Sequence, residues 1–325
     1  MTLKWGVFGA GSVAQRRAMP AIHKATNAEL HALFSRDAAR AKQLATEHNA
    51  TKSYSNVDDL LTDSELDAIY ISTPVNLHCE QVIAAAEQGL HVLCDKPMAL
   101  TPQECERMIA ACKANDVHLQ VCYLFRFHSC FQKIREWVDE GRLGKIVHGR
   151  MPFLKKYQLS ADEWRAIPDQ GGGGCLMDLG PHSVDLLRYL IGEVTEVSAF
   201  CNSAIHNYQV EETGGILMQF QNGAQGFTDL SFSVAQCDIV LELYGTNGSV
   251  TVINDDGWKI HTYFDGEKQV TASQFEDLYQ HQFEHFAECV RTGIAPLASG
   301  DDGLRANVIL DAAYQSARTG KVIQC

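Results

Sequence analysis

The chain has 325 residues and a formal net charge of −13, and 46% of its residues are hydrophobic. This length predicts two domains, each with its own core, and the composition excludes a disordered or fibrous protein. The acidic balance opposes nucleic-acid binding, and no run approaches the roughly 20 apolar residues of a membrane span. Because the start carries no export signal, we expect a cytoplasmic protein with neither a membrane nor a nucleic acid as partner.

The eleven cysteines are scattered along the chain without a C-x-x-C pair. Isolated cysteines of this kind behave as small apolar residues. We therefore expect reduced, mostly buried thiols and no metal site.

The first part of the chain alternates short apolar runs with helix-like stretches, which is typical of βαβ units around a parallel sheet. The expected strands are Leu3–Phe8, Leu30–Phe34, Ala68–Ser72, His91–Cys94 and Val117–Cys122. Thr101-Pro102-Gln103-Glu104 has the cap residue, first-turn proline and glutamate that start a helix at Pro102.

After residue 122 the rhythm changes to helices mixed with longer β-like segments. The expected elements are helix Phe131–Glu140, strand Ile146–Met151, helix Cys175–Ile191 ended by Gly192, strands at Phe200, Ile216–Phe220, Gly226–Phe232, Ile239–Tyr244 and Ser249–Ile253, and helices Tyr279–Arg291 and Asp301–Arg318. Asn222-Gly223 and Asn247-Gly248 are strong hairpin signals.

These patterns predict the fold class α/β, with a Rossmann-type parallel-sheet domain over residues 1–122. Residues 123–325 are expected to form an α+β domain with an open, mostly antiparallel sheet. Its C-terminal helix could pack back on the first domain.

The first strand runs into Gly9-Ala10-Gly11-Ser12-Val13-Ala14, which satisfies G-x-G-x-x-A at a strand-to-helix turn. Gly9 would make the tight turn, Gly11 would let backbone N–H groups of Ser12 and Val13 approach a pyrophosphate, and Ala14 would allow close helix packing. The position after the first strand of a βα series favours dinucleotide binding over an ordinary turn.

The second strand ends at Ser35-Arg36, where an NAD-preferring fold usually has a carboxylate for the ribose 2′-hydroxyl. A hydroxyl and a guanidinium suit a 2′-phosphate, so NADP is the expected cofactor, with NAD as the alternative. In that alternative Arg36 is a solvated loop residue. Asp37 then either caps helix Ala38–Glu47 or turns inward to the ribose.

Two further segments carry candidate acid-base groups. Asp95-Lys96-Pro97 ends the fourth strand, at the sheet edge where such folds bind ligands. Asp178 and His182 share one helix face with Asp185 at i, i+4 and i+7.

Two alternatives remain for that helix face. It could be a solvent-facing polar surface. Cys175, Asp178 and His182 could also ligate a metal, although no further cluster completes a zinc shell.

In this order and spacing, the glycine motif, Thr73-Pro74 with Asn76 and His78, Asp95-Lys96-Pro97, and G-G-G-x-x-x-D-x-G-x-H-x-x-D together resemble the Gfo/Idh/MocA oxidoreductase family. The resemblance covers essentially the whole chain and implies Lys96, Asp178 and His182 as catalytic residues, with a strained or cis bond at Lys96–Pro97. Asp95 stands where the family commonly has glutamate. The cofactor-binding residues expected from motif and resemblance are Gly9, Gly11, Ser12, Val13, Ser35, Arg36, Thr73, Pro74, Asn76, His78, Asp95 and Lys96.

Trp164-Arg165 and the segment Asp185–Leu190 look most like the sugar-reducing and NADP-dependent sugar dehydrogenase members of that family. The expected function is hydride transfer between a nicotinamide and a secondary alcohol or ketone of a sugar, anhydro-sugar or cyclic polyol. Arg126, Tyr157, Trp164 and Arg165 are the expected substrate-binding residues.

In this hypothesis His182 moves the proton, Lys96 polarises the reacting oxygen, and Asp178 binds a neighbouring hydroxyl or orients the histidine. Alternatives are a glycoside-cleaving enzyme that oxidises its substrate transiently, a non-catalytic NADP sensor and a scaffold. The resemblance also implies a homo-oligomer through the second-domain sheet.

Overall fold

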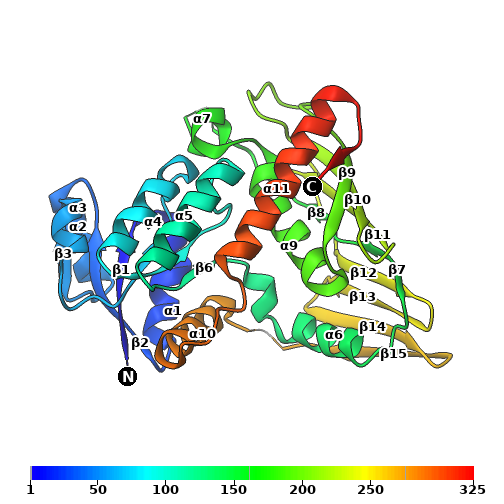
Figure 1. Ribbon diagram of the computed structural model, residues 1–325, viewed down its shortest axis with the longest axis horizontal. Coiled ribbons are helices and arrows are strands. Elements are labelled where there is room, and N and C mark those ends of the chain that lie inside the picture. Colours follow the sequence, from blue (N-terminus) through cyan, green and yellow to red (C-terminus); the bar gives the residue numbers. More distant parts are fainter. Residues whose placement is uncertain (1, 161, 275) are drawn as a thin grey trace. The chain divides into compact units, whose positions relative to one another are not determined.

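The computed structural model describes residues 2–160, 162–274 and 276–325. It divides into two compact units, the first comprising Met1–Leu124 and Asp277–Leu304, and the second Phe125–Glu276 and Arg305–Cys325 (Figure 1). The predicted division placed residues 123–325 in the second domain, with a C-terminal helix that could pack back on the first, and residues 277–304 group here with the first unit.

The reason for this grouping is an aromatic contact in the core of the first unit. Helix α10 (Leu278–Thr292) buries Phe283 and Phe286 completely. The Phe283 ring lies 4.8 Å from that of Trp5 and 5.6 Å from that of Tyr70, both on strands of the first sheet. Residues 1–122 alone would leave that face of the sheet in water.

The first sheet is parallel throughout and has the order β3-β2-β1-β4-β5-β6. Its strands are β1 (Leu3–Phe8), β2 (Ala28–Phe34), β3 (Lys52–Tyr54), β4 (Ala68–Ile71), β5 (His91–Cys94) and β6 (Leu119–Val121). The five predicted strands are confirmed, and the short edge strand β3 was missed. The order reverses between β1 and β4, which makes the carboxyl ends of these two strands the topological switch point.

Helices connect these strands on both faces of the sheet, because right-handed crossovers that move in opposite directions from β1 fall on opposite faces. They are π-helical η1 (Ala14–Ala18), α1 (Met19–Lys24), α2 (Ala38–Glu47), α3 (Val57–Leu61), η2 (Val75–Leu77), α4 (His78–Glu87) and α5 (Pro102–Ala114). The predicted start at Pro102 is confirmed, because Thr101 and Glu104 form a capping box on α5. Asp37 caps α2, which was one of the alternatives for that residue.

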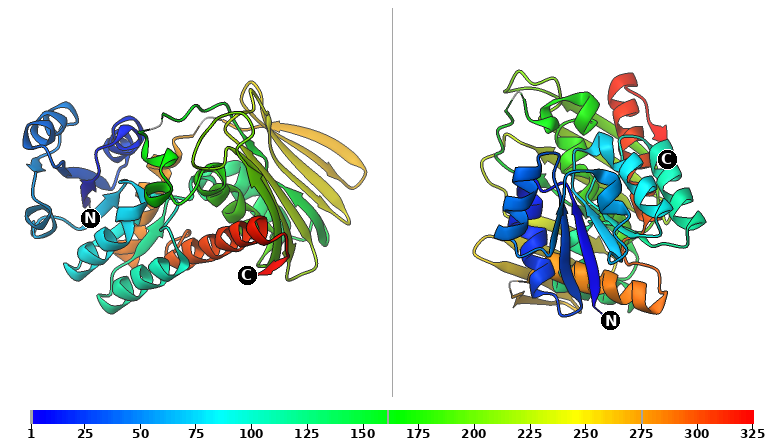
Figure 2. Two further views of the ribbon diagram at one scale, coloured as in Figure 1. Left: turned by 90° about the horizontal axis from the view of Figure 1, so that it is seen from above. Right: turned by 90° about the vertical axis from the view of Figure 1, so that its left-hand side faces the viewer.

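The second unit is built on one large sheet, seen in Figure 2 in green to yellow. The sheet is mixed but mostly antiparallel, in the order β15-β14-β13-β12-β7-β11-β10-β9-β16, with β8 paired to β11. The strands are β7 (Ile146–Arg150), β8 (Phe153–Leu154), β9 (Val194–Asn202), β10 (Thr213–Phe220), β11 (Gln225–Ser231), β12 (Ile239–Gly245), β13 (Gly248–Asn254), β14 (Trp258–Phe264), β15 (Glu267–Ala272) and β16 (Ile323–Gln324). The turns at Asn222-Gly223 and Asn247-Gly248 join β10 to β11 and β12 to β13, as predicted.

Helices cover one face of this sheet. They are η3 (Leu124–Phe127), α6 (Ser129–Asp139), η4 (Trp164–Ala166), α7 (Pro168–Gly171), α8 (Cys175–Asp178), α9 (Gly180–Ile191) and α11 (Gly300–Thr319), which runs across the division of the chain at residue 304. A β-carbon on Gly149 of β7 would lie within 3.3 Å of Leu187 and Ile191 side chains of α9, so the glycine permits this close packing.

The prediction of one continuous helix over Cys175–Ile191 is wrong. The stretch Cys175–Ile191 is two helices, α8 and α9, separated at Leu179. Pro181 has no N–H to continue the ladder of α8, and its ring opposes the carbonyl one turn earlier. Asp178 therefore ends one helix and His182 lies in the first turn of the next.

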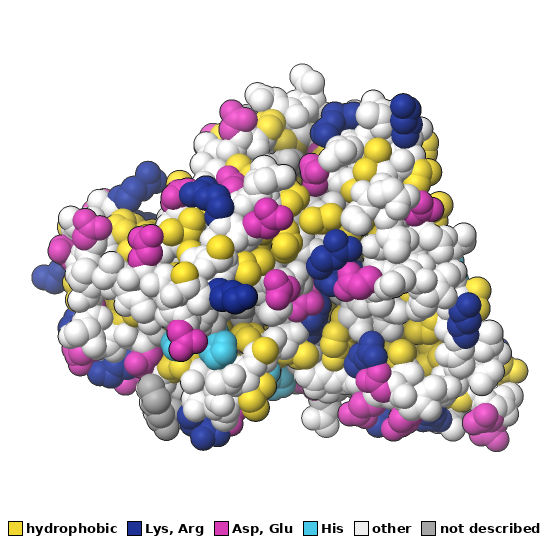
Figure 3. Space-filling model, in the orientation of Figure 1, with side chains coloured by type: hydrophobic (Ala, Val, Ile, Leu, Met, Phe, Trp, Pro, Cys, Tyr) yellow, Lys and Arg dark blue, Asp and Glu magenta, His cyan; other side chains and the backbone are white. Residues whose placement is uncertain are grey.

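None of the described helices is long and apolar enough to cross a membrane. Acidic and basic side chains are interspersed on the face in Figure 3, in keeping with a net charge of −13 spread over the surface.

Candidate active site

Loops at the carboxyl ends of four parallel strands bring the predicted dinucleotide residues to one edge of the first sheet. Gly9 follows β1, Ser35 and Arg36 follow β2, Thr73 follows β4, and Lys96 follows β5. Since this edge contains the switch point between β1 and β4, it is where a fold of this type binds its ligand.

Two glycines in the first loop have different steric roles. Gly9 has φ +98°, and a β-carbon there would lie 2.7 Å from Thr73 Cγ2 and 3.0 Å from the Ser72 carbonyl carbon. At Gly11 a β-carbon would meet nothing within 4 Å. The first glycine is thus fixed by the turn and the neighbouring strand, whereas the second leaves open space in front of the helix that follows.

Helical backbone begins at Ser12, which is exposed, and Val13 is half-buried. The N–H groups of a helical first turn have no partner one turn earlier, so they can bind an anion such as a pyrophosphate. Pro20, in α1, has no N–H to donate to the preceding turn, and that turn is the π-helical η1. The residues present therefore fit a dinucleotide phosphate.

The hydrogen bonds after β2 favour the interpretation of Asp37 as a helix cap over a contact with the ribose. Its Oδ1 accepts hydrogen bonds from the N–H groups of Ala39 at 2.9 Å and Arg40 at 3.1 Å. Arg36 is exposed and Ser35 half-buried. With its carboxylate used as a helix cap, Asp37 is not turned toward a ribose.

His78 joins two of the loops rather than facing solvent. It is 1% exposed, its Nε2 lies 2.9 Å from the Thr73 carbonyl oxygen, and its Nδ1 lies 3.1 Å from that of Pro97. The sequence predicts direct cofactor contact for His78, whereas the buried side chain lies behind the loops, where it acts as a positioning residue. Asn76 is exposed, and Pro74 precedes it in the same turn.

The Lys96–Pro97 bond is cis, as the resemblance implied. The backbone N–H of Lys96 donates to Asp95 Oδ1 at 2.8 Å, and the Tyr70 hydroxyl donates to Asp95 Oδ2 at 3.4 Å. Asp95 therefore fixes the backbone from which the lysine side chain extends, and this role does not require the longer glutamate.

In the second unit, Asp178 belongs to a polar network. Arg165 Nε donates to Asp178 Oδ1 at 3.4 Å, and Arg165 Nη1 donates to Glu163 Oε1 at 3.1 Å. The Tyr157 hydroxyl donates to the same Glu163 oxygen at 2.6 Å. Burial and this hydrogen bond raise the pKa of Tyr157 to about 12, so its hydroxyl stays protonated at neutral pH.

The third predicted substrate residue of this segment, Trp164, supports the network from the side. The guanidinium carbon of Arg165 lies 4.1 Å from the centre of the Trp164 ring, a cation–π geometry. Glu163 joins Tyr157 to Arg165, and sequence analysis missed it. The local pattern Glu163-Trp164-Arg165 is its only signal.

His182 is surrounded by aromatic rings. The Phe125 and Phe153 ring centres lie 5.5 and 5.7 Å from the centre of the imidazole. Lys155 Nζ lies 5.7 Å from the centre of the Phe153 ring and 5.2 Å from that of Tyr157. The sequence does not indicate either phenylalanine, because an isolated aromatic residue in an element as short as η3 or β8 has no spacing that distinguishes it from core.

Arg126, predicted to bind substrate, lies in a buried ion pair with Asp185. Arg126 donates from Nη2 to Asp185 Oδ1 at 2.7 Å and from Nε to Oδ2 at 3.0 Å, and their side chains are 6% and 1% exposed. The Arg126 guanidinium also lies 5.0 Å from the centre of the Tyr189 ring. The structure thus corrects the expectation of substrate contact for Arg126, which ties η3 to α9.

The geometry also bears on the metal alternative. Cys175 is completely buried, its Sγ donates to the Leu230 carbonyl at 3.5 Å, and burial raises the pKa of its thiol. A thiolate ligand is disfavoured there.

Within the described ranges, His31, Asp63 and Glu65 do place ligand atoms within 4.8 Å of one another. Lys52 already pairs with both carboxylates, at 3.0 Å from Asp63 and 2.7 Å from Glu65, and Lys4 lies 2.9 Å from Glu65, so two lysines offset the two carboxylates.

The fold and these loops define a two-unit, dinucleotide-binding oxidoreductase. Residues 3–123 match the model of the oxidoreductase family with the NAD-binding Rossmann fold, and residues 131–251 match the Gfo/Idh/MocA C-terminal domain. The chain belongs to the Gfo/Idh/MocA family of NAD(P)-binding oxidoreductases.

Curated proteins that are similar over nearly the whole chain include enzymes that act on sugars. A 1,5-anhydro-D-fructose reductase of Ensifer adhaerens is 29% identical, with 99% of this chain and 98% of the relative covered. An NADP-dependent D-xylose 1-dehydrogenase of Haloferax volcanii is also 29% identical, with 99% of each chain covered. The crystal structure of an aldose-aldose oxidoreductase from Caulobacter crescentus with glycerol has a TM-score of 0.93 and 29% identity, covering 100% of both chains.

The two glycines provide a matched test of the first loop. Gly9→Ala should lower the stability of the protein by about 1–3 kcal/mol, because alanine would have to adopt a positive φ against the backbone of Ser72. Gly11→Ala should change stability by less than about 0.5 kcal/mol but weaken dinucleotide binding, because its methyl group enters the open space. Thermal unfolding and dinucleotide titration of both variants measure these effects. Equal unfolding temperatures of the two, or unimpaired binding by Gly11→Ala, would contradict the assignment.

Proposed function

We propose that this protein exchanges a hydride between a nicotinamide cofactor and a secondary alcohol or ketone of a sugar, anhydro-sugar or cyclic polyol. The observation that carries the substrate class is the network of Tyr157, Glu163, Arg165 and Asp178. It presents several donors and acceptors beside aromatic rings, as recognition of a hydroxylated ring requires. The sugar reductase and dehydrogenases among the relatives support the same class.

The proposed roles follow from the chemistry of each side chain. The nicotinamide, when bound, supplies or accepts the hydride. His182 would transfer the proton of the reacting hydroxyl, since an imidazole titrates near neutral pH. Lys96 would stabilise negative charge developing on that oxygen, and Asp178 would accept a hydrogen bond from a neighbouring hydroxyl.

The other predicted residues divide into contact and positioning roles. Tyr157, Trp164 and Arg165 are proposed to contact substrate. For the cofactor, the proposed contacts are Gly9, Gly11, Ser12, Val13, Ser35, Arg36, Thr73, Pro74, Asn76, Asp95 and Lys96. His78 is proposed to hold the loops that carry the cofactor contacts, and Arg126 to hold η3 against α9, which carries His182.

A second candidate uses the same residues to oxidise a glycoside transiently, so that a glycosidic bond can be eliminated before the hydride returns. It differs in its stoichiometry, because it releases no reduced cofactor in net turnover. The polar network beside His182 serves either reaction. A non-catalytic sensor would not require Lys96, Asp178 and His182 together.

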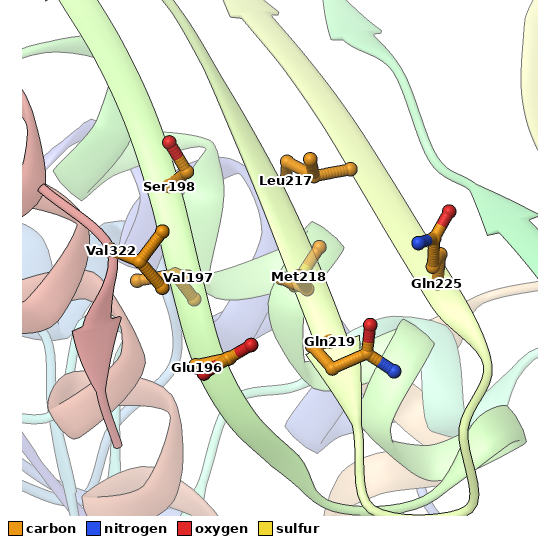
Figure 4. A pocket seen from close by; sticks show the side chains of 8 residues that line it. All are labelled: Glu196, Val197, Ser198, Leu217, Met218, Gln219, Gln225 and Val322. Atoms are coloured by element: carbon orange, nitrogen blue, oxygen red, sulfur yellow. The ribbon is translucent and has the colours of Figure 1, made fainter.

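Assembly into a homo-oligomer through the second sheet is also a proposal. Phe200, Leu217, Tyr244 and Tyr263 lie on one face of that sheet and are 81%, 47%, 41% and 44% exposed. Figure 4 shows a shallow pocket on this face, where Leu217 is in register with Ser198. Covering these apolar side chains with a second copy would remove them from water.

A cytoplasmic location is proposed as well. All eleven cysteines are free, and eight are buried. A reducing compartment keeps such thiols in this state.

Loss of either reacting group tests the catalytic assignment. Lys96→Met and His182→Asn should each lower turnover by about two orders of magnitude or more, because charge stabilisation or proton transfer is removed. Cofactor affinity should change little in His182→Asn, because His182 is not among the proposed cofactor contacts. The measurement is cofactor reduction or oxidation with a panel of aldoses, ketoses, anhydro-sugars and inositols.

The matched controls replace the exposed Lys113 and His23, as Lys113→Met and His23→Asn, and should retain activity. Near-normal turnover in either site variant would reject its role. No turnover by the unmodified protein with any member of the panel would reject the proposed substrate class.

Cofactor choice tests the loop after β2. Arg36 should favour NADP over NAD by about tenfold to a hundredfold, because a charge-assisted hydrogen bond to the 2′-phosphate is worth roughly 1.5–3 kcal/mol. Arg36→Ala should remove most of this preference and leave NAD affinity nearly unchanged. Lys42→Ala, an exposed cation farther along α2, is the control. Tighter binding of NAD than NADP by the unmodified protein would contradict the prediction.

A further inference from the structure

An apolar pocket of about 260 Å³ lies within the second unit, separate from the polar network. Its walls come from the segment Met151–Leu154, the start of β12, Trp258 of β14 and Phe125 of η3. The lining residues are Phe125, Met151, Pro152, Phe153, Leu154, Cys237, Ile239, Val240, Asn254 and Trp258. Asn254 alone among them has a polar amide side chain, and it is exposed.

The pocket is open rather than a gap inside the core. Phe125, Phe153, Ile239, Val240 and Trp258 are all partly exposed, unlike the side chains of the core. Apolar surface left in contact with water costs roughly 25 cal/mol per Å² relative to burial. A concave group of such side chains therefore favours an apolar ligand that covers them.

Three rings give the pocket an aromatic wall. The ring centres of Phe125 and Phe153 are 6.2 Å apart, and those of Phe125 and Trp258 are 6.3 Å apart at an interplanar angle of 67°. Tilted and edge-to-face arrangements at this spacing are favourable for aromatic groups. A flat aromatic ligand can extend the same pattern.

The pocket shares its wall with the surroundings of His182. Phe125 and Phe153 both line the pocket and lie 5.5 and 5.7 Å, centre to centre, from the imidazole. At these distances both rings are in direct contact with the imidazole, so the same two side chains border His182 and line the pocket. A hydroxylated ring held at His182 would thus lie next to the pocket wall, and a substituent on it would extend toward the pocket.

We propose that this pocket binds an apolar substituent, preferably an aryl group, attached to the sugar or polyol on which the protein acts. The proposal rests on the proposed function for the sugar part and adds the class of substituent. The size agrees, since a cavity of roughly 150 Å³ lined by apolar side chains is sufficient to hold benzene. The physiological substrate would then be an aryl or similarly apolar glycoside or ether of a sugar or polyol.

The first experiment measures ligand binding to the pocket and does not depend on catalytic turnover. Benzyl alcohol is titrated into the protein and binding is followed by calorimetry or ligand-observed NMR, with an expected Kd of about 1 mM or below. Val240→Phe fills the pocket and should weaken this binding at least about tenfold. Val270→Phe makes the same change at a side chain on β15 that is 61% exposed, and should bind as the unmodified protein does.

A second variant distinguishes filling of the pocket from misfolding of β12. Cys237→Phe places the added ring in the loop before that strand and should have the same effect as Val240→Phe. Absence of benzyl alcohol binding by the unmodified protein, or equal binding by the pocket-filling variants, would overturn the proposal.

The second experiment compares the phenyl and methyl glycosides of the sugar that gives turnover. The phenyl glycoside should have a kcat/KM at least about tenfold higher, and this ratio should fall toward one in Val240→Phe but persist in Val270→Phe. Turnover without aryl preference would overturn the pocket proposal and leave the proposed function standing. Failure of every sugar and polyol, with benzyl alcohol still bound, would overturn the proposed function instead.

Discussion

The buried pair of Arg126 and Asp185 is the interaction on which the second unit's site depends. It joins η3, directly after the first sheet's last strand in the chain, to α9, which carries His182. Two charges removed from water are stable only while they satisfy each other, so neither segment can shift independently of the other. The neighbour of Arg126 in the chain is Phe125, whose ring lies against His182 and lines the apolar pocket. One ion pair thereby sets the position of the proposed acid-base group and of the wall beside it.

A related constraint acts in the first unit. The two ring nitrogens of His78 lie 2.9 and 3.1 Å from backbone carbonyl oxygens of the loop after β4 and the loop after β5, so the ring packs between the loops and donates to one of them. Asp95 accepts a hydrogen bond from the backbone N–H of Lys96. These contacts use polar groups to fix loop backbone, leaving other side chains for ligand. The polar residues of both units therefore fall into two groups, those that hold the loops and those that are proposed to touch the reactants.

Local signals were sufficient for much of the fold. The glycine motif, the capping box at Thr101 and the Asn-Gly turns each depend on residues adjacent in the chain, and all three form the expected structures. The failures have a common physical cause in contacts between distant segments. The return of α10 depends on Phe283 packing against Trp5, and nothing near residue 283 indicates this partner. The same limit concealed that Arg126 pairs with Asp185, 59 residues away, and that Glu163 joins Tyr157 to Arg165. Periodicity predicted one helix face for Asp178, His182 and Asp185, but the break at Leu179 puts Asp178 on a separate helix. Nor could periodicity indicate that Asp185 is buried in an ion pair.

The central claim is direct hydride exchange at a carbinol carbon, and isotopic labelling tests it most directly. A sugar from the active panel, deuterated at the reacting carbinol carbon, would be incubated with the protein and oxidised NADP. The account predicts one deuterium on the nicotinamide ring of the reduced cofactor per ketone formed, together with a slower turnover than with the unlabelled sugar. Product formation with the deuterium released to water, and none on the nicotinamide, would contradict it.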